Sequence, residues 1–597
     1  MSTFTDALPS KTLLGHPLGL YVCFLTEMWE RFAFYGMKAL LLLYLIQHHK
    51  FSDDDGYILL GTYAGLAYAL PLLGGMIADR WLGMRKAVVY GGLLLVFGQL
   101  GMAYVGNPAE GISGSAVQDA FAVQVMYFSL ALIGVGVGFL KPNISTIVGK
   151  LYTENDPRRD SGFTVFYMGI NLGAMLSSLV VGYIGMSPEW GWGWGFGLAG
   201  VLMLFGLVQF LFGQKHLEGH AEPPNPAALR EPVVGIPREW LIYLLGLVGV
   251  VVMWWVLQTK IDLGPLSALV GGHEVTLTEI VAVVLGLGLF VWFFWFLFSG
   301  ITAVQRGRMI VLMSLIVISA LFWGLYEQTY GTWVAFTERG MTKDLFPGFA
   351  KATGTPLPWS LLSLIVIPAG FLAAMRIAQK RGDGGAAKLL PTIALTLVLV
   401  FMLRDILIVP QTAGSLTFLG ALFVVVLTPI FAALWPVLDR HRLNPSAPAK
   451  FGLGLVFAGL SMGVLAYAAT QPGDNGLVNV WWLVAAYFVL ELGEMVLSPI
   501  GLSAVTTLSV ARVVGMMMGA WFLFSAFGEI IAGRFGTLAS LDPNPDGSYD
   551  TAKALVVYGE TFTTLMWVGL ASGAVMLGLS PVLNRLTRER VVPAVAA

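Results

Sequence analysis

The stretch LGLYVCFLTEMWERFAFYGMKALLLLYLI, residues 18–46, holds four charged side chains inside a segment long and apolar enough to cross a membrane. One face of the expected helix, an arc of about 140°, carries Glu27, Glu30, Arg31, Tyr35 and Lys38. An ionised side chain near the bilayer centre costs at least ~2.5–3.5 kcal/mol, so this face needs a polar interior and partners. The charged face predicts the lining of a solute or proton pathway. The alternative interpretation is a set of internal salt bridges that only hold helices together.

The composition limits the class of protein. The 597-residue chain is 57% hydrophobic and 12% charged, with a mean hydropathy of +0.77. A soluble globular fold of this length cannot bury so much apolar surface, so we expect an all-α polytopic membrane protein. The net charge of −1 gives no indication of a nucleic-acid partner. The single cysteine, Cys23, excludes an intrachain disulfide, and the histidines lack the spacing of a metal site.

Apolar runs of membrane-spanning length predict roughly sixteen transmembrane helices. The expected spans are 18–46, 57–79, 86–106, 118–148, 160–185, 193–214, 238–258, 275–300, 309–334, 358–377, 388–410, 413–437, 450–470, 480–508, 513–537 and 560–586. Basic clusters follow alternate spans, for example Arg80 and Arg85 after the second and Arg440 and Arg442 after the twelfth. With an even number of spans they lie on the same side as both termini, which the positive-inside rule then places in the cytoplasm.

A polar, proline-rich segment that begins at Lys215 divides the chain. We expect an N-terminal six-helix bundle over 1–214, a linker with two inserted transmembrane helices over 215–307, and a C-terminal six-helix bundle over 308–597 with an added helical pair near 358–410. A faint repeat supports two related halves, because GGMIADRWLGMRK and LDRHRLNPSAPAK both carry an Asp-Arg pair followed by basic residues. Such halves are typical of a transporter with its site at the membrane midplane.

Several motifs resemble those of the proton-dependent oligopeptide transporter family, a branch of the major facilitator superfamily. EMWERFAFYG, residues 27–36, looks like the family's E-x-x-E-R-F-x-Y-Y-G motif, with Phe34 at the first tyrosine. Further matches are GGMIADRWLG at 74–83, FLKPN at 139–143, FYMGINLG at 166–173, the FW and YEQ of 322–328, the GE and SP of 493–499, and WF at 521–522. The chain departs from the family at Gly420-Ala421, where relatives usually carry Asn-Pro, and in the added pair near 358–410.

The resemblance implies a major facilitator fold with two six-helix bundles plus extra helices. It implies a proton-coupled symporter that imports di- and tripeptides by alternating access, in the bacterial cytoplasmic (inner) membrane. The expected partners are peptides, protons and membrane lipid, and the expected functional unit is a monomer. No cofactor is expected beyond protons as the coupling ion, and no enzymatic activity.

The charged residues of the spans divide unequally between the two halves. The first half contributes the basic residues Arg31, Lys38 and Lys141, and the second half the acidic residues Glu327, Glu491 and Glu494. A cavity with one positive and one negative wall suits a zwitterion, because charge-assisted hydrogen bonds are roughly twice as strong as neutral ones. We therefore assign the basic residues to the substrate carboxylate, and Glu327 and Glu494 to the substrate amino group.

Uncharged side chains complete the expected substrate site. Hydrogen bonds to the peptide backbone are assigned to Tyr35, Tyr68, Asn171 and Gln328, although Tyr68 and Asn171 also suit ordinary helix packing. Side-chain pockets are assigned to Trp323, Trp521 and Phe522. Glu491 shares a helix face with Glu494, and either a substrate contact or a structural partnership fits it.

The residues expected to couple proton movement are Glu27, Glu30, Arg31, Lys141, Glu327 and Glu494. Glu27 lies at i−4 from Arg31 and is its direct helical neighbour, whereas Glu30 points further round the helix. A paired carboxylate stays ionised, but an unpaired one in a low dielectric tends to bind a proton. Alternating access would then exchange partners, for instance between Arg31 and Glu30 or between Lys141 and Glu494.

Asp79, Arg80 and Arg85 are expected to form a cytoplasmic gating latch, with a simple topology anchor as the alternative reading. The alternative substrate class is nitrate or another small anion, which plant members of the same family carry. The intact Glu27, Glu30 and Arg31 motif and Lys141 favour peptides. A membrane enzyme would need a nucleophile–base or metal constellation at span depth, which the sequence does not show, and a channel would show no counterflow.

Overall fold

The computed structural model describes residues 12–587 apart from 154–155, 157, 263, 265–273, 348–408 and 545–546. Within these residues, 12 helices meet the length and hydropathy needed to cross a membrane. The charged first helix and the helix at 84–102 also have spanning length. Each predicted span outside 350–408 coincides with a helix, which confirms the all-α polytopic fold. The expected span 358–377 and nearly all of 388–410 lie outside the described residues.

The N-terminal bundle is built from seven helical segments. They are α1 (Leu18–Leu43), α2 (Asp53–Ile77), α3 (Met84–Met102), α4 (Ala120–Lys150), α5 (Arg159–Ser177), α6 (Tyr183–Met186) and α7 (Trp192–Gly213). A five-residue π-helical turn, Ser178–Gly182, joins α5 to α6 within a single span. Ser52 caps α2 by accepting a hydrogen bond from the Asp55 backbone amide, so α2 begins at Asp53.

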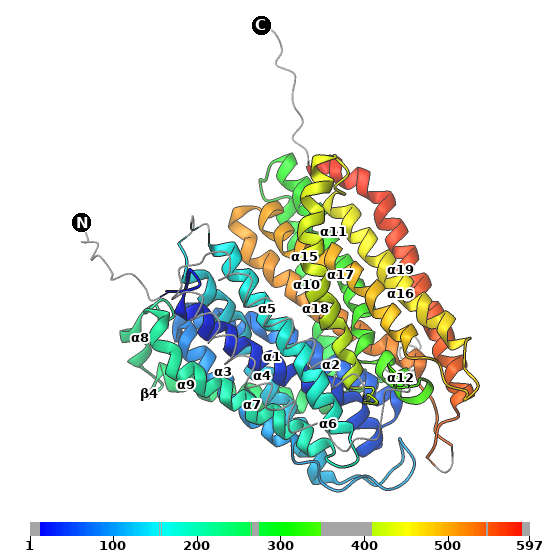
Figure 1. The fold of residues 1–597 in the computed structure, drawn as a ribbon. Helices are drawn as coiled ribbons and strands as arrows, with labels where there is room; N and C mark the ends of the chain where they lie inside the picture. Colours follow the sequence, from blue (N-terminus) through cyan, green and yellow to red (C-terminus); the bar gives the residue numbers. More distant parts are fainter. Residues whose placement is uncertain are drawn as a thin grey trace, which may run out of the picture.

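The C-terminal bundle follows the linker. It consists of α11 (Ala303–Tyr326), α12 (Thr332–Gly340), α15 (Phe418–Arg440), α16 (Ala447–Ala469), α17 (Trp481–Leu508), α18 (Val514–Gly536) and α19 (Thr551–Thr587). The 3₁₀ turn Glu327–Thr329 links α11 to α12. Figure 1 shows the blue-to-cyan helices of the first bundle on one side and the yellow-to-red helices of the second on the other. The bundles meet where α2 packs on α18 and α5 packs on α15.

The linker holds α8 (Pro226–Arg230) and two membrane-length helices, α9 (Arg238–Gln258) and α10 (Leu277–Leu297). Two-residue strands form three antiparallel pairs: β1 (Thr12–Leu13) with β2 (His16–Pro17), β3 (Pro232–Val233) with β4 (Ile236–Pro237), and β5 (Lys260–Ile261) with β6 (Val275–Thr276). These strand pairs end immediately before α1, α9 and α10.

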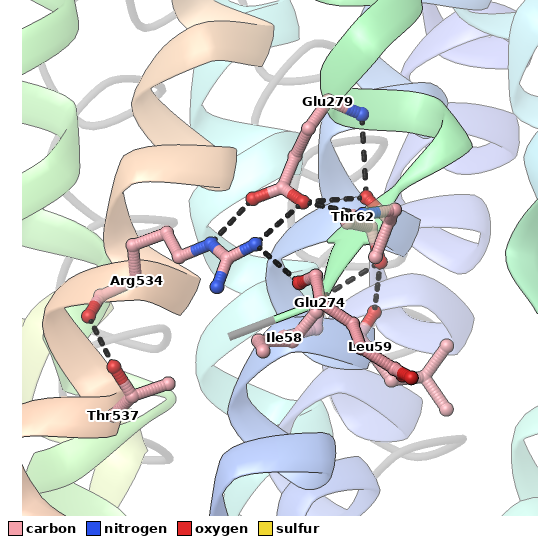
Figure 2. Close-up of polar contacts among 8 residues, drawn as sticks. Ile58, Leu59, Thr62, Glu274, Glu279, Arg534 and Thr537 are labelled. Atoms are coloured by element: carbon pink, nitrogen blue, oxygen red, sulfur yellow. Dashed lines mark hydrogen bonds and ion pairs between the residues drawn. The ribbon is translucent and has the colours of Figure 1, made fainter. Parts of the chain in front are cut away.

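The inserted pair contacts both bundles. Helix α9 packs on α4, and Lys86 Nζ lies 2.6 Å from Glu239 Oε2 at its first turn. Helix α10 packs on α18, where Arg534 Nε donates to Glu279 Oε1 at 2.5 Å and Arg534 Nη2 donates to Glu279 Oε2 at 2.8 Å. Arg534 Nη2 also donates to the Glu274 carbonyl at 2.9 Å (Figure 2). The inserted pair is therefore tied to both bundles, to the first through α9 and to the second through α10.

Glycines allow the bundles to approach closely at the α2–α18 contact. A Cβ on Gly61 would lie 2.7 Å from the Glu529 carbonyl oxygen, and a Cβ on Gly533 would lie 2.8 Å from the Tyr57 carbonyl oxygen. Real Cβ atoms do not come this close to backbone, so a larger residue at either position would push the two helices apart. This contact brings the interior faces of α1, α2, α11 and α18 together.

Candidate functional site

A cavity of about 160 Å³ lies between the two bundles. The N-terminal bundle contributes Tyr35, Tyr68, Tyr167 and Asn171, and the C-terminal bundle contributes Trp323, Tyr326, Glu327, Tyr330, Tyr487 and Glu494. Six of the residues assigned to the substrate from sequence therefore share this cavity: Tyr35, Tyr68, Asn171, Trp323, Glu327 and Glu494. Many of its polar groups are phenol hydroxyls, which donate and accept hydrogen bonds without carrying charge.

Arg31 on α1 is fully buried and held by two carboxylates. Its Nη2 donates to Glu30 Oε1 at 2.5 Å, and its Nε also bonds the other oxygen of Glu30. Glu27 Oε1 lies further away, 3.4 Å from Arg31 Nε. The sequence prediction made Glu27 the direct neighbour, but the structure gives the bidentate contact to Glu30. The planar guanidinium can fold back along the helix and meet the adjacent residue with two parallel bonds.

The basic side of the site lies behind a layer of aromatic rings. Lys141 Nζ is 4.3 Å from the centre of the Tyr68 ring, and the Arg31 guanidinium is 5.7 Å from the centre of the Tyr35 ring. The Tyr35 and Tyr330 rings stack across the bundles with centroids 6.0 Å apart. Cations over aromatic faces gain electrostatic attraction while they keep charge near a cavity. Tyr35 and Tyr68 thus separate Arg31 and Lys141 from the cavity that these rings line.

The acidic side of the site is carried by α17. Glu494 lines the cavity and is 8% exposed, whereas Glu491, one turn earlier, is fully buried. The Tyr326 hydroxyl donates to Glu491 Oε1 at 3.0 Å. A Cβ on Gly420 would lie 3.1 Å from that same Glu491 oxygen, so the glycine at the departure from the family pattern leaves room for Glu491. The structure places Glu491 behind Glu494, where it contacts Tyr326.

Lys38 connects the two bundles. Its Nζ lies 2.7 Å from Glu327 Oε2 and 2.9 Å from Glu529 Oε1, and all three side chains are buried. The sequence assignment of Lys38 to the substrate carboxylate stays a prediction, because in this conformation its ammonium is occupied by these acids. Glu529 was missed from sequence, although an isolated acid in the run AWFLFSAFGEIIAG is itself a signal of function.

Three predicted residues are placed away from the cavity lining. Gln328 Nε2 donates to the Gly324 carbonyl at 3.0 Å and to the Ala532 carbonyl at 2.9 Å, so it ties α11 to α18. Trp521 is buried against α17, where its ring fills the space that a Cβ on Gly501 would take. Phe522 is half-buried and packs on the hydrophobic core. Their assignments to the substrate stay predictions.

The three residues of the expected cytoplasmic latch, Asp79, Arg80 and Arg85, do not contact one another through ion pairs among the described residues. Arg85 Nε and Nη2 donate to Glu222 in the linker at 2.6 and 2.9 Å, and Arg85 Nη1 donates to Gln214 at 3.1 Å. The hydrogen bond from Arg85 holds the pKa of the Glu222 carboxyl below its usual range. Asp79 and Arg80 are exposed, and Arg80 stacks on Trp81 at 5.0 Å. Arg85 therefore ties α3 to the linker here, and a gating role stays a prediction.

A second interbundle ion pair was not predicted from the sequence. Arg339, in the last turn of α12, bonds Asp53 at the start of α2, with Nη1–Oδ2 at 2.6 Å and Nη2–Oδ1 at 2.7 Å. Arg339 Nη1 also bonds the Tyr558 hydroxyl, and the Leu541 amide donates to Asp53. The sequence gives no sign of the pair, because Asp53 and Arg339 are 286 positions apart along the chain. Together with Lys38, this pair closes the end of the molecule where α2 begins.

No group of three His, Cys, Asp or Glu side chains among the described residues is arranged to hold a metal ion. The cavity offers phenol hydroxyls, the Asn171 amide, two carboxylates in its lining and two cations behind its tyrosines. This arrangement offers directional contacts to a polar, charged solute, and the described lining residues include no nucleophile paired with a base.

Comparison with known proteins decides the family. The model of the POT family matches residues 85–236 and 404–549. The uncharacterized transporter YclF of Bacillus subtilis is 30% identical over 97% of this chain and 96% of its own length. The chain belongs to the POT family. Among similar proteins, the dipeptide and tripeptide permease A of Cronobacter turicensis is 28% identical over 97% of this chain and 95% of that protein.

The fold agrees with this membership. The crystal structure of a mutant of peptide transporter POT in complex with alafosfalin has 30% sequence identity and a TM-score of 0.70, and the match covers 98% of both chains. This POT family member is a transporter and not an enzyme. The membership confirms the resemblance seen in the motifs around Arg31, Lys141, Asn171 and Glu494.

Proposed function

We propose that this POT family member is a proton-coupled symporter that imports di- and tripeptides by alternating access. The observation that carries the proposal is the cavity between the bundles, with Glu494 and Glu327 on its C-terminal wall and Tyr35, Tyr68 and Asn171 on its N-terminal wall. Lys141 and Arg31 stand behind the two tyrosines. A short peptide carries an ammonium at one end and a carboxylate at the other, which matches this polarity.

The substrate amino group would bind Glu494, and the substrate carboxylate would lie toward Lys141 and Arg31. Tyr68 and Asn171 would hydrogen-bond the peptide backbone. Recognition of the ends and the backbone tolerates many side chains, so a broad range of short peptides is expected. Relatives such as the dipeptide and tripeptide permease A support this substrate class, and a carrier of nitrate or another small anion is not favoured.

Proton coupling would use the carboxylates that are paired with cations across or within the bundles. One such pair, Glu30 and Arg31, lies within α1. Another, Glu327 and Lys38, joins the end of α11 to α1. When a cation leaves, the remaining carboxylate in a low dielectric binds a proton. Protons are then the coupling ion, and no cofactor is required. The protein would act as a monomer in the bacterial inner membrane with both termini in the cytoplasm, as the basic clusters after alternate helices support.

The test is uptake of labelled dialanine into proteoliposomes under an imposed inward proton gradient. The proposal expects accumulation above the external concentration that collapses when a protonophore removes the gradient. Excess unlabelled dialanine should compete, whereas excess nitrate should leave uptake unchanged. Accumulation that ignores the protonophore, or competition by nitrate alone, would overturn the proposal.

A further inference from the structure

Lys38 of α1 is shared by two carboxylates of the opposite bundle. Its ammonium lies 2.7 Å from Glu327 Oε2, at the end of α11, and 2.9 Å from Glu529 Oε1, on α18. The exposed fractions are 1% for Lys38, 7% for Glu327 and 3% for Glu529. Two acids and one base are therefore enclosed together at the junction of the bundles. We call Lys38, Glu327 and Glu529 the junction cluster.

The charges of the junction cluster do not cancel if both acids are ionised. Glu529 faces Lys38 from α1, Glu327 from the end of α11, and three tyrosines of α2, Tyr57, Tyr63 and Tyr68. Glu327 also faces Tyr35 from α1, Tyr330 from the turn before α12, and Tyr487 and Glu494 from α17. The tyrosines are neutral near pH 7, so the cluster would carry one net negative charge. An uncompensated buried charge costs several kcal/mol, and the cluster is balanced when one of its two acids holds a proton.

The two acids differ in their access to the transport cavity. Glu327 borders both the substrate cavity and a small enclosed space of about 10 Å³, which is room for about one water molecule. Glu529 borders the enclosed space, together with Tyr57 and Gly61 of α2. Glu327 is thus the acid placed to exchange a proton with the cavity, and Glu529 is the acid placed to remain with Lys38.

We propose that Glu529 is a positioning counter-ion that keeps Lys38 paired while Glu327 carries the transported proton. This inference rests on the proposed function, since it names a further residue for proton coupling. A proton that binds a Glu327 oxygen forms an O–H bond and ends the ionic attraction of that carboxylate for Lys38. Lys38 stays bonded to Glu529, the cluster is neutral, and the bundles remain in contact in the protonated state.

The return step follows from the same charges. When Glu327 releases its proton into the cavity, the closed cluster carries one excess negative charge. That charge favours separation of α1 from α11 and α18, where water solvates the acids and Glu327 binds another proton. Without Glu529, protonation of Glu327 would leave the Lys38 ammonium buried and unpaired, and the closed state could not carry the proton.

The experiment compares peptide counterflow of the wild type and Glu529→Gln in proteoliposomes at equal internal and external pH. At about pH 7.5 the closed cluster can be balanced in both proteins, by one proton shared between its two acids in the wild type and by the Lys38–Glu327 pair alone in Glu529→Gln, so both should exchange labelled dialanine. At about pH 5.5 we expect Glu529→Gln to lose about tenfold or more of its exchange rate, as a cost of several kcal/mol implies, while the wild type changes less than about threefold. The matched control Glu560→Gln, an exposed acid on α19, should follow the wild type.

The outcomes separate this inference from the proposed function. If Glu529→Gln keeps the wild-type pH profile, or if it inserts correctly and is inactive at every pH, the counter-ion role is overturned. Should Glu529→Gln fail to insert, Glu529→Asp decides, because its shorter acid weakens the pairing and is expected to give a smaller loss confined to the acid side. An unchanged profile of Glu529→Asp would then overturn the inference. Wild-type protein that does not exchange dialanine at any pH would instead refute the proposed function.

Discussion

The guanidinium of Arg339 and the carboxylate of Asp53 form a buried, bidentate ion pair that joins the last turn of α12 to the first turn of α2. The two side chains are 5% and 2% exposed. They belong to different bundles, so the pair exists only when the bundles are closed at this end. Lys38 and its two acids lie on the same side of the molecule. Ion pairs between the bundles therefore stabilise the closed arrangement of this end.

Replacement of Arg339 by Gln should destabilise the closed end, because Asp53 is left buried without its cation. Removal of one partner of a buried pair costs about 3–5 kcal/mol, which is comparable to the few kcal/mol that separate two conformations of a protein. We expect proton-driven dialanine uptake to fall more than about tenfold, together with a lower thermal midpoint in detergent. Arg440→Gln, which removes an exposed arginine of α15, is the control. Wild-type uptake and midpoint in Arg339→Gln would show that the pair does not govern closure.

Substitution of Glu494 by Gln should weaken binding of the substrate amino group. A hydrogen bond to a charged group contributes about 1.5–3 kcal/mol, so the KM for dialanine is expected to rise about tenfold to a hundredfold. Propionyl-alanine has the shape of dialanine without the amino group, and its inhibition constant should be equal in the wild type and the variant. Dialanine uptake that is unaffected by Glu494→Gln would place the amino group elsewhere.

Neutralisation of Glu30 should separate substrate exchange from proton-driven accumulation. Glu30 makes the closest bonds to Arg31, and the Gln variant keeps the shape but can neither ionise nor bind a transported proton. Counterflow of dialanine should persist, while accumulation against a gradient should be lost. Both assays use the same proteoliposomes. If Glu30→Gln still concentrates dialanine, the proton is carried by other groups.

The Arg85–Glu222 contact predicts a small loss of stability in acid. Arg85 holds the pKa of Glu222 below its usual range, so the contact contributes fully above the ordinary glutamate pKa of about 4.3 and is lost as the pH falls below it. The pair is partly exposed and screened by solvent, which limits its contribution to under about 1 kcal/mol. The thermal midpoint of Glu222→Gln should lie slightly below the wild type at pH 7 and converge with it at low pH. A constant difference across this range would argue against the ion pair.

Much of the architecture follows from the sequence alone. Long apolar runs separated by basic loops specify membrane helices, because the backbone must satisfy its hydrogen bonds within the bilayer. Charges in α1 mark a functional interior, since lipid does not tolerate them without partners. Tyr35, Tyr68, Asn171, Trp323 and Glu494 could be assigned to one site from the sequence, and the structure brings them to one cavity.

The pairing of charges was decided by tertiary structure. Sequence spacing made Glu27 the neighbour of Arg31, and it could not show that Lys38 reaches Glu529, almost 500 positions away along the chain. It also gave no sign that Asp53 and Arg339 form a pair. Helical periodicity determines which side chains share a face of one helix. The distance between the faces of different helices depends on close contacts, such as that of Gly61 of α2 with α18. The composition and the pattern of apolar and charged residues therefore specified a membrane carrier, whereas helix packing determined which of its charged residues form ion pairs.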